Sequence, residues 1–160
     1  MFDKEKVSYL GHIISKEGVK VDPEKIKSIT DCPKPTNISK LRGFLGLTGY
    51  YQRFIRIYVH ITAPLSNLLN KNAFQWNVEA EKHFESFEGI MSSTYVLATL
   101  DFSKPFVIEC DASGYGLGAI LMQYEHPIAF ESTKFNKWEK LKSTYDKEML
   151  ETIQALVKWR

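Results

Sequence analysis

The sequence is poor in the residues that stabilise secreted or membrane-bound proteins. It has two cysteines, Cys32 and Cys110, whose wide separation makes neither a disulfide framework nor a metal-ligand cluster, so we expect two reduced structural thiols. No apolar run approaches the roughly 18 residues that a membrane span needs, and the charged start lacks a signal-peptide core. We therefore expect an intracellular chain, in the cytoplasm or nucleus, that is neither secreted nor bound to a membrane.

Acidic residues are absent between Cys32 and Val78, although six cations and seven aromatic residues lie there. Cations can bind phosphates and flat rings can stack on bases or sugars, so this basic aromatic block is typical of a nucleic-acid groove. The alternative from composition alone is a helical module whose aromatic residues form its core. The residues expected to contact nucleic acid are Lys40, Arg42, Tyr50, Tyr51, Arg53 and Arg56.

Helix-start signals divide the first half of the chain into short helices. Asp22 before Pro23 predicts one helix, and Thr36 or Asn37 can cap a second. A third helical stretch covers residues 51–58, and Pro64 is expected to open a fourth. Further along, Asn77 is expected to cap a fifth helix, with these apolar residues on one side: Ala80, Phe84, Phe87 and Met91.

The second of these helices contains Gly43, Gly46 and Gly49. Glycine inside a helix costs about 1 kcal/mol relative to alanine. We therefore expect either close helix packing or a close approach of the backbone to a ligand at these positions.

Strand patterns flank the helical segment on both sides. Residues 6–14 alternate and predict an edge hairpin with the segment that follows, and from residue 104 three successive strands precede a helix over 143–160. Ser143 and Asp146 have the spacing of a capping box. The apolar stripe expected on that last helix comprises Met149, Ile153 and Leu156. The order of elements predicts an α+β fold that ends in a β-β-β-α unit.

Asp111 ends the first of these three strands, where an apolar residue would be expected, and Glu148 lies in the second turn of the last helix. If the helix packs across the sheet, the two carboxylates can converge, and hard divalent cations prefer oxygen ligands. Two such ions can hydrolyse a phosphodiester. The alternatives are that Asp111 only caps a turn through Ser113 and Gly114, and that Glu148 is a solvated helix residue.

Five strings, in order and at consistent spacing, resemble the Pol polyprotein of gypsy-type long-terminal-repeat retrotransposons. They are "YLGHIIS" at 9–15, "LRGFLGLTGYYQRFI" at 41–55, "APLSNLL" at 63–69, "FQW" at 74–76 and "CDASGYGLGAILMQ" at 110–123. The resemblance runs over nearly the whole chain. It implies the C-terminal edge of a reverse-transcriptase palm over residues 1–21, a helical thumb or connection over 22–94, and the N-terminal half of a ribonuclease H-like domain over 95–160.

By the same resemblance, Asp111 and Glu148 are catalytic metal ligands for Mg²⁺ or Mn²⁺. The basic aromatic block then belongs to the thumb, which grips an RNA/DNA hybrid or primer-template duplex. The partners implied are this duplex and the remainder of the Pol polyprotein, with no membrane.

The chain also departs from the family pattern. It contains no Tyr-x-Asp-Asp element and lacks two of the four nuclease carboxylates that the resemblance implies, and two carboxylates do not readily hold two metal ions. We therefore expect the parent enzyme's RNA-directed DNA synthesis and hybrid cleavage to be absent from this chain in isolation. Gln52 replaces a usual Arg or Lys, and Glu151 stands where a small apolar residue is usual.

Two other functions stay open from the sequence. The chain could be a non-catalytic remnant that binds nucleic acid or a protein partner. It could also be a phosphate-handling ATPase of the same broad fold, although a second phosphate loop is not visible in the sequence.

Overall fold

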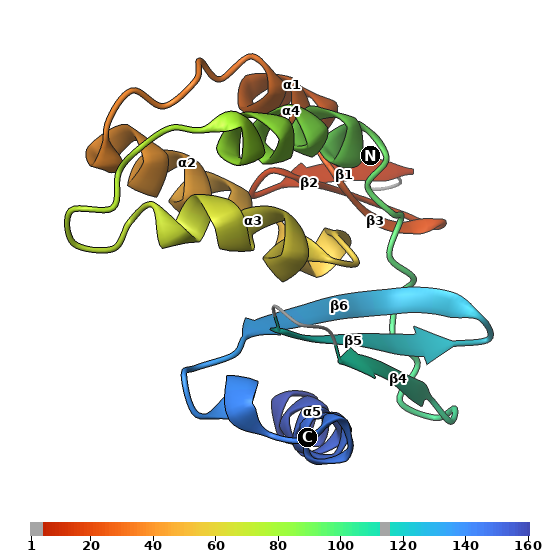
Figure 1. Cartoon of the computed structure of the whole chain (residues 1–160). Coiled ribbons are helices and arrows are strands. Elements are labelled where there is room, and N and C mark those ends of the chain that lie inside the picture. The colour runs from red at the N-terminus through yellow and green to blue at the C-terminus, as the bar shows by residue number, and fades with distance from the viewer. Residues whose placement is uncertain (1–4, 113–115) are drawn as a thin grey trace.

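The structure is a computed structural model that describes residues 5–112 and 116–160, without the side chains of Glu88, Asp111 and Ala112. Its described part contains two three-stranded antiparallel sheets and five α-helices, which confirms the α+β class. The helices α1 to α4 gather beside the first sheet, and the second sheet lies between α3 and α5 (Figure 1). No helix among the described residues is long and apolar enough to cross a membrane.

The first sheet is a meander of β1 (Lys6–Tyr9), β2 (His12–Ser15) and β3 (Gly18–Val21). The strand predicted over residues 6–14 is therefore wrong in extent. Leu10 and Gly11 have φ values of 48° and 78°, so the chain turns between β1 and β2. Glycine reaches that left-handed conformation at no steric cost.

In the helical region, α1 to α4, three of the four helices begin on a predicted cap, and α3 begins without a side-chain cap. Its elements are α1 (Pro23–Thr30), α2 (Ile38–Gly49), the 3₁₀ helix η1 (Gln52–Phe54), α3 (Tyr58–Asn67) and α4 (Val78–Ser92). The side chains of Asp22, Asn37 and Asn77 accept hydrogen bonds from the amides of Glu24, Lys40 and Ala80, respectively. These bonds satisfy amides that a helix start leaves without a partner.

The prediction that Pro64 opens a helix is wrong, because Pro64 lies inside α3. The predicted helix over 51–58 is likewise reduced to η1 and a short loop. A proline inside a helix removes one backbone hydrogen bond. Burial of the residues around it, from Ile61 to Leu65, offsets that loss.

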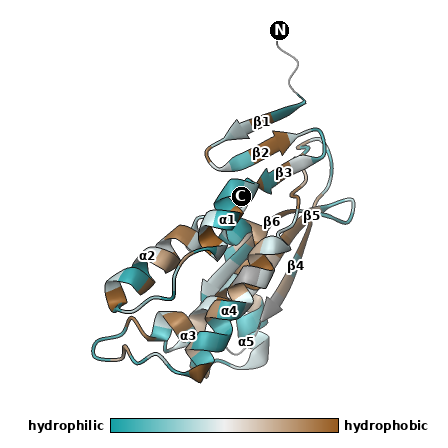
Figure 2. Ribbon diagram, turned by 90° about the horizontal axis from the view of Figure 1, so that it is seen from above, coloured by the Kyte–Doolittle hydropathy of each residue, from teal (hydrophilic) through white to brown (hydrophobic). Residues whose placement is uncertain are grey.

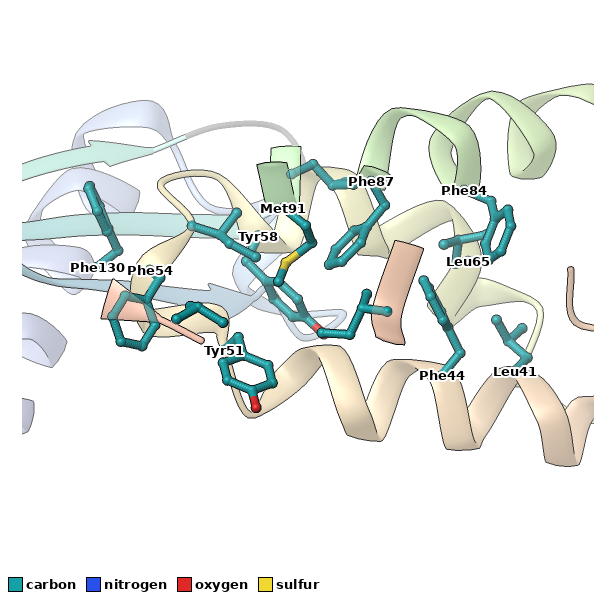
Figure 3. Close-up of a cluster of buried hydrophobic side chains, with 14 of the residues drawn as sticks. Leu41, Phe44, Tyr51, Phe54, Tyr58, Leu65, Phe84, Phe87, Met91 and Phe130 are labelled. Carbon is teal, nitrogen blue, oxygen red and sulfur yellow. The ribbon is translucent and has the colours of Figure 1, made fainter. Parts of the chain in front are cut away.

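The core of the helical region is a continuous aromatic cluster (Figure 3). Phe44 of α2 lies 5.0 Å from Phe84 and 5.5 Å from Phe87 of α4, measured between ring centroids. The four residues predicted on one side of α4 are all buried. Phe130 joins the same cluster from the second sheet, so the two regions share one core.

The sheet-helix unit comprises β4 (Val107–Ala112), β5 (Gly116–Gln123), β6 (His126–Lys134), the 3₁₀ helix η2 (Glu139–Leu141) and α5 (Thr144–Lys158). The three strands pair antiparallel in sequence order, which confirms the β-β-β-α prediction. Tyr124 and Glu125 turn the chain from β5 to β6 with φ values of 49° and 63°. Gly116 packs tightly, since a Cβ there would lie 2.4 Å from the Thr133 carbonyl oxygen.

Helix α5 begins as predicted, but its apolar stripe faces outward. Ser143 accepts a hydrogen bond from the Asp146 amide, as in a capping box. Met149, Ile153 and Leu156 remain 51–56% exposed, which corrects the expectation that they pack on the sheet. Glu151 and Ala155 are buried instead, at 1% and 2% exposure, because the opposite side of α5 lies against β4 and β5.

The linker between α4 and β4, residues 93–106, joins the two sheets through backbone hydrogen bonds. Val19 and Leu97 exchange two backbone hydrogen bonds of 2.8 Å, and the Ala98 amide donates to the Pro127 carbonyl at 2.8 Å. The contact requires glycine at position 18, where a Cβ would lie 2.1 Å from the Leu97 carbonyl oxygen. The linker therefore contacts β3 on one side and the start of β6 on the other.

Candidate functional site

Helix α2 exposes one side while the other builds the core. Leu41, Phe44 and Thr48 are buried. Lys40, Arg42 and Leu47 of α2 are exposed, as is Tyr50 at its C-cap, so the exposed side carries both polar and apolar residues. Figure 2 shows hydrophilic and hydrophobic residues mixed along α2. We call the exposed side, defined by Lys40, Gly43, Gly46, Leu47 and Tyr50, the α2 face.

Two of the three glycines of α2 lie on this face with free space beside the backbone. A Cβ added at Gly43 or Gly46 would meet no atom of the described residues within 4 Å, whereas one at Gly49 would lie 3.4 Å from the Tyr58 hydroxyl. Helix packing therefore explains Gly49 only. Gly43 and Gly46 leave the α2 backbone accessible between a cation and an aromatic ring.

Tyr50 is held in place at the end of the α2 face. Its ring stacks on His12, with centroids 5.4 Å apart and planes 12° apart, and its hydroxyl donates to the Leu10 carbonyl at 3.3 Å. Burial, and secondarily Arg53, lower the pKa of His12 below its usual value of 6.5. Tyr50 therefore presents a fixed ring, 53% exposed, to solvent.

Tyr51 is buried, and its predicted contact with nucleic acid is corrected. Its side chain is only 3% exposed and packs edge-on against His12 and Tyr50. Burial raises the pKa of its hydroxyl, with smaller effects of Tyr50 and Asp22. Tyr51 supports the ring of Tyr50 from behind instead of facing a ligand.

The aromatic residues and the cations of the basic aromatic block differ in burial. Most of its aromatic residues lie in or against the core, whereas Arg53 and Arg56 are exposed. Lys34 is engaged within the fold, since it forms an ion pair with Glu81 and lies 5.5 Å from the centroid of the Trp76 ring. The exposed cations of this block thus remain available at the surface.

A hollow of about 350 Å³ lies where the helical region meets the sheet-helix unit. Tyr50, Gln52 and Arg53 line one side, and Lys158 and Trp159 at the end of α5 line the other. The central part of β6 lies between them. We call this the junction hollow. Lys158 and Trp159 are not among the residues predicted from the sequence, although a cation beside an aromatic residue is the same signal that marked the basic aromatic block.

Arg56 lines a second hollow, of about 190 Å³, against residues of β4, β5 and β6. His60, Glu109, Gly118 and Ser132 also line it. The structure thus separates Arg56 from Arg53, although only two residues lie between them in the sequence.

The predicted metal ligands are placed only in part. The backbone of Asp111 pairs with Gly118 at the end of β4, but its side chain lies outside the described residues, as does Gly114. Glu148 is exposed on α5, in a shallow surface with Tyr145, Met149, Thr152 and Ile153. Helix α5 does pack against β4, as the prediction requires. Among the described residues, no three metal-binding side chains cluster.

The buried side of α5 carries the unusual Glu151. Burial raises the pKa of the Cys110 thiol in β4. A hydrogen bond with Thr152 lowers this pKa in part, and the charge of Glu151 raises it. Cys110 and Cys32 are free thiols, as predicted. Glu151 thus places a carboxylate between α5 and the sheet.

Solved structures with the same fold are reverse transcriptases of foamy virus. The protease-reverse transcriptase in complex with an RNA/DNA hybrid superposes with a TM-score of 0.87, over 97% of this chain and 22% of that one, at 23% sequence identity. The complex of the same protein with double-stranded DNA gives a TM-score of 0.86, over 97% and 34% of the two chains, at 22% identity. These likenesses establish the fold.

Sequence relatives agree with the motifs quoted above. The Pol polyprotein from transposon 297 of Drosophila melanogaster is 38% identical over 99% of this chain, and that from transposon opus is 35% identical over 94%. The chain spans only 15% and 17% of their lengths. The model of the RNase H-like domain found in reverse transcriptase matches residues 76–160. The chain therefore belongs to this family of RNase H-like domains and corresponds to a segment of retrotransposon Pol polyproteins.

Proposed function

We propose that this chain binds a nucleic-acid duplex, an RNA/DNA hybrid or primer-template, along the α2 face. The observation that carries the proposal is the pair of open glycines, Gly43 and Gly46, in an otherwise well-capped helix. Each is expected to cost about 1 kcal/mol of helix stability, and packing within the described chain does not offset this cost. A ligand that approaches the helix backbone would offset it.

The chemistry of the α2 face suits a duplex. Lys40 and Arg42 can contact phosphates, and Tyr50 and Leu47 can contact sugars or base edges beside the open backbone. Phosphate contacts position a duplex without reading its sequence. We therefore expect binding that depends strongly on salt and weakly on base sequence.

The foamy-virus proteins of the same fold were solved with double-stranded DNA and with an RNA/DNA hybrid, which supports this choice of ligand. In a whole Pol polyprotein, the proposed role of the segment is to hold the duplex during RNA-directed DNA synthesis and cleavage of the RNA strand. The division into a palm edge over 1–21, a thumb over 22–94 and a ribonuclease H-like part over 95–160 belongs to the same proposal.

The test combines two glycine substitutions with one matched control. Gly43→Ala and Gly46→Ala should each stabilise the chain by up to about 1 kcal/mol, because the added methyl meets open space. Each should also weaken binding of an RNA/DNA hybrid, measured by fluorescence anisotropy. Gly89→Ala in α4, where a Cβ also meets no atom within 4 Å, should give a similar stability gain without the binding loss.

Equal affinities of the three variants for the hybrid would contradict an approach of the ligand to α2. A salt dependence no steeper than that of an unrelated protein of equal charge would contradict duplex binding altogether.

We also propose that Asp111 and Glu148 serve as metal ligands for cleavage of the RNA strand in the longer protein. Their carboxylate oxygens suit Mg²⁺ or Mn²⁺, which would activate water and stabilise the leaving oxygen. Glu148 is exposed and lies on a helix that packs against the strand of Asp111. Two carboxylates are few for two ions, so we expect this chain alone to show little or no cleavage.

The assay for this role is magnesium- or manganese-dependent cleavage of a hybrid by a longer Pol segment that contains this chain. Asp111→Asn and Glu148→Gln should each abolish cleavage while leaving hybrid affinity nearly unchanged. Cleavage that survives Asp111→Asn would exclude Asp111 as a metal ligand.

The exposed apolar side of α5 favours a further partner. Tyr145, Met149, Ile153, Leu156 and Val157 are all more than half exposed, and apolar patches of this kind commonly mark interaction sites. We propose that the remainder of the Pol polyprotein covers them. A covalently continuous Pol segment should protect the amides of α5 from hydrogen exchange more strongly than this chain alone does.

A further inference from the structure

We propose that the junction hollow is a second nucleic-acid site, which takes the sugar-phosphate backbone of one strand leaving the α2 face. The inference deepens the proposed function and rests on it. Its new residues are Lys158 and Trp159 of α5, together with Gln52. They would extend the path of the duplex from the helical region onto the sheet-helix unit.

Continuity with the α2 face is the first reason. Tyr50 belongs to both surfaces, since it caps the C-terminus of α2 and also lines the junction hollow. A strand that follows the α2 face past Tyr50 therefore meets the opening of the hollow. Because the Tyr50 ring is fixed by its stack on His12, the entrance is formed before a ligand arrives.

The composition of the hollow is the second reason. Arg53 and Lys158 supply one cation from each side, and Tyr50 and Trp159 supply aromatic walls. Phosphates bind such cations, and sugars or bases contact such rings. The Gln52 side chain adds a neutral hydrogen-bonding group beside them.

One acidic residue, Glu131, modulates this site. Its Oε2 lies 3.3 Å from Lys158 Nζ, and Glu131 is partly buried in β6. The ion pair holds the lysine over β6, while the carboxylate repels an incoming phosphate. Lys158 and Glu131 should therefore have opposite effects on binding.

The test measures binding of a single RNA/DNA hybrid to the full chain over a series of salt concentrations. A hybrid of about 18 base pairs is roughly 60 Å long, which exceeds the diameter of a 160-residue domain. Lys158→Gln should weaken binding and reduce the slope of log affinity against log salt by about 1, as expected for one lost phosphate contact. Glu131→Gln should strengthen binding.

The matched control is Lys142→Gln, which removes the same charge beyond the other end of α5. It should leave both affinity and salt slope unchanged. Equal losses for Lys142→Gln and Lys158→Gln would indicate a general charge effect and overturn the site. Weaker binding by Glu131→Gln would overturn it as well, because that carboxylate would then be a favourable element.

A variant of Trp159 tests the aromatic wall. Trp159→Leu keeps an apolar side chain at the C-cap of α5 and should reduce affinity for the hybrid at high salt, where stacking contributes relatively more. Circular dichroism checks that α5 is retained, and if it is lost, Trp159→Met, which is also apolar and not aromatic, replaces the variant in the same assay. Affinity unchanged by a folded variant would exclude a contact with this ring.

These outcomes separate the inference from the function on which it rests. If the hybrid does not bind the unaltered chain, the proposed function itself fails. If the hybrid binds and Gly43→Ala weakens it, but Lys158→Gln and Glu131→Gln have no effect, the duplex lies on the α2 face and the junction hollow is not a site.

Discussion

The helical region and the sheet-helix unit contain similar apolar residues but bury them to different extents. In the helical region, α2, α3 and α4 surround an aromatic cluster whose members are almost completely buried. In the sheet-helix unit, one side of α5 covers the sheet and the other side exposes five large apolar residues. A carboxylate, Glu151, occupies the buried side.

This difference separates apolar side chains that are buried within the described chain from apolar side chains that are exposed. Each layer of secondary structure needs a partner on its apolar face. The helices of the first part provide such partners to one another, and Phe130 of β6 joins them. Helix α5 has a partner on one side only within the described chain, so its contribution to stability should be small.

The largest expected effect tests that contrast directly. Phe87→Ala removes a ring that is 1% exposed and should cost about 3 to 5 kcal/mol of unfolding free energy, because it leaves a cavity in the aromatic cluster. Ile153→Ala on α5 should cost less than about 1 kcal/mol, because its side chain is already half exposed. Urea denaturation of both variants measures the two losses of unfolding free energy, which can then be compared. Similar losses would mean that the two regions are equally well packed.

The next largest effect is a gain in stability, which we expect from a substitution on the buried side of α5. Glu151→Met replaces a buried carboxylate by an unbranched apolar side chain of similar length and should stabilise the chain by about 1 to 2 kcal/mol at pH 7. Glu85→Met, at an exposed position of α4, should change stability by no more than about 0.5 kcal/mol. Destabilisation by Glu151→Met would show that the interactions of this carboxylate outweigh the cost of burying it.

The smallest effect concerns pH and the contact between the first sheet and the helical region. The pKa of His12 is lowered in the folded chain by burial and by Arg53, so folding favours the neutral imidazole. His12 therefore does not reduce the stability of the fold at a pH above 6.5, the usual pKa of histidine. As the pH decreases from 6.5 to the lowered pKa, its protonation in the unfolded chain reduces the free energy of unfolding.

Thermal unfolding between pH 7.5 and 5 measures this loss. His12→Phe should reduce the decrease in Tm over that range, since it keeps an aromatic ring beside Tyr50 without a titrating group. His126→Asn, at the exposed start of β6, serves as the control and should leave the decrease unchanged. An identical pH profile for all three proteins would rule out His12 as its source.

Local signals in the sequence predicted most of the helix starts and the three strands of the second sheet. Asp22, Asn37, Asn77 and Ser143 act within a few residues of the chain, so their caps do not depend on tertiary structure. The turn at Tyr124 and Glu125 lacks a comparable local signal, because its two positive φ values occur without glycine.

The errors arose where packing decides the outcome. Pro64 looks like a helix start in sequence, but burial keeps α3 continuous through it. The apolar stripe of α5 was assigned correctly as a pattern, yet periodicity does not reveal which side finds a partner. Tyr50 and Tyr51 are neighbours of the same residue type, and the sequence does not predict that Tyr51 joins the core while Tyr50 remains exposed. The role of the two predicted carboxylates stays a prediction.

The bridge between Val19 and Leu97 has a consequence for the order of folding. These two residues flank the whole helical region, so their hydrogen bonds close a long loop that contains α1 to α4. Closing a loop costs entropy that grows with its length, and contacts between distant residues form slowly. We expect the caps and the aromatic cluster to form first and to bring the ends of this loop together, so that the two sheets become joined late. A chain arrested before that step would retain its helices and lack a fixed orientation between the two sheets.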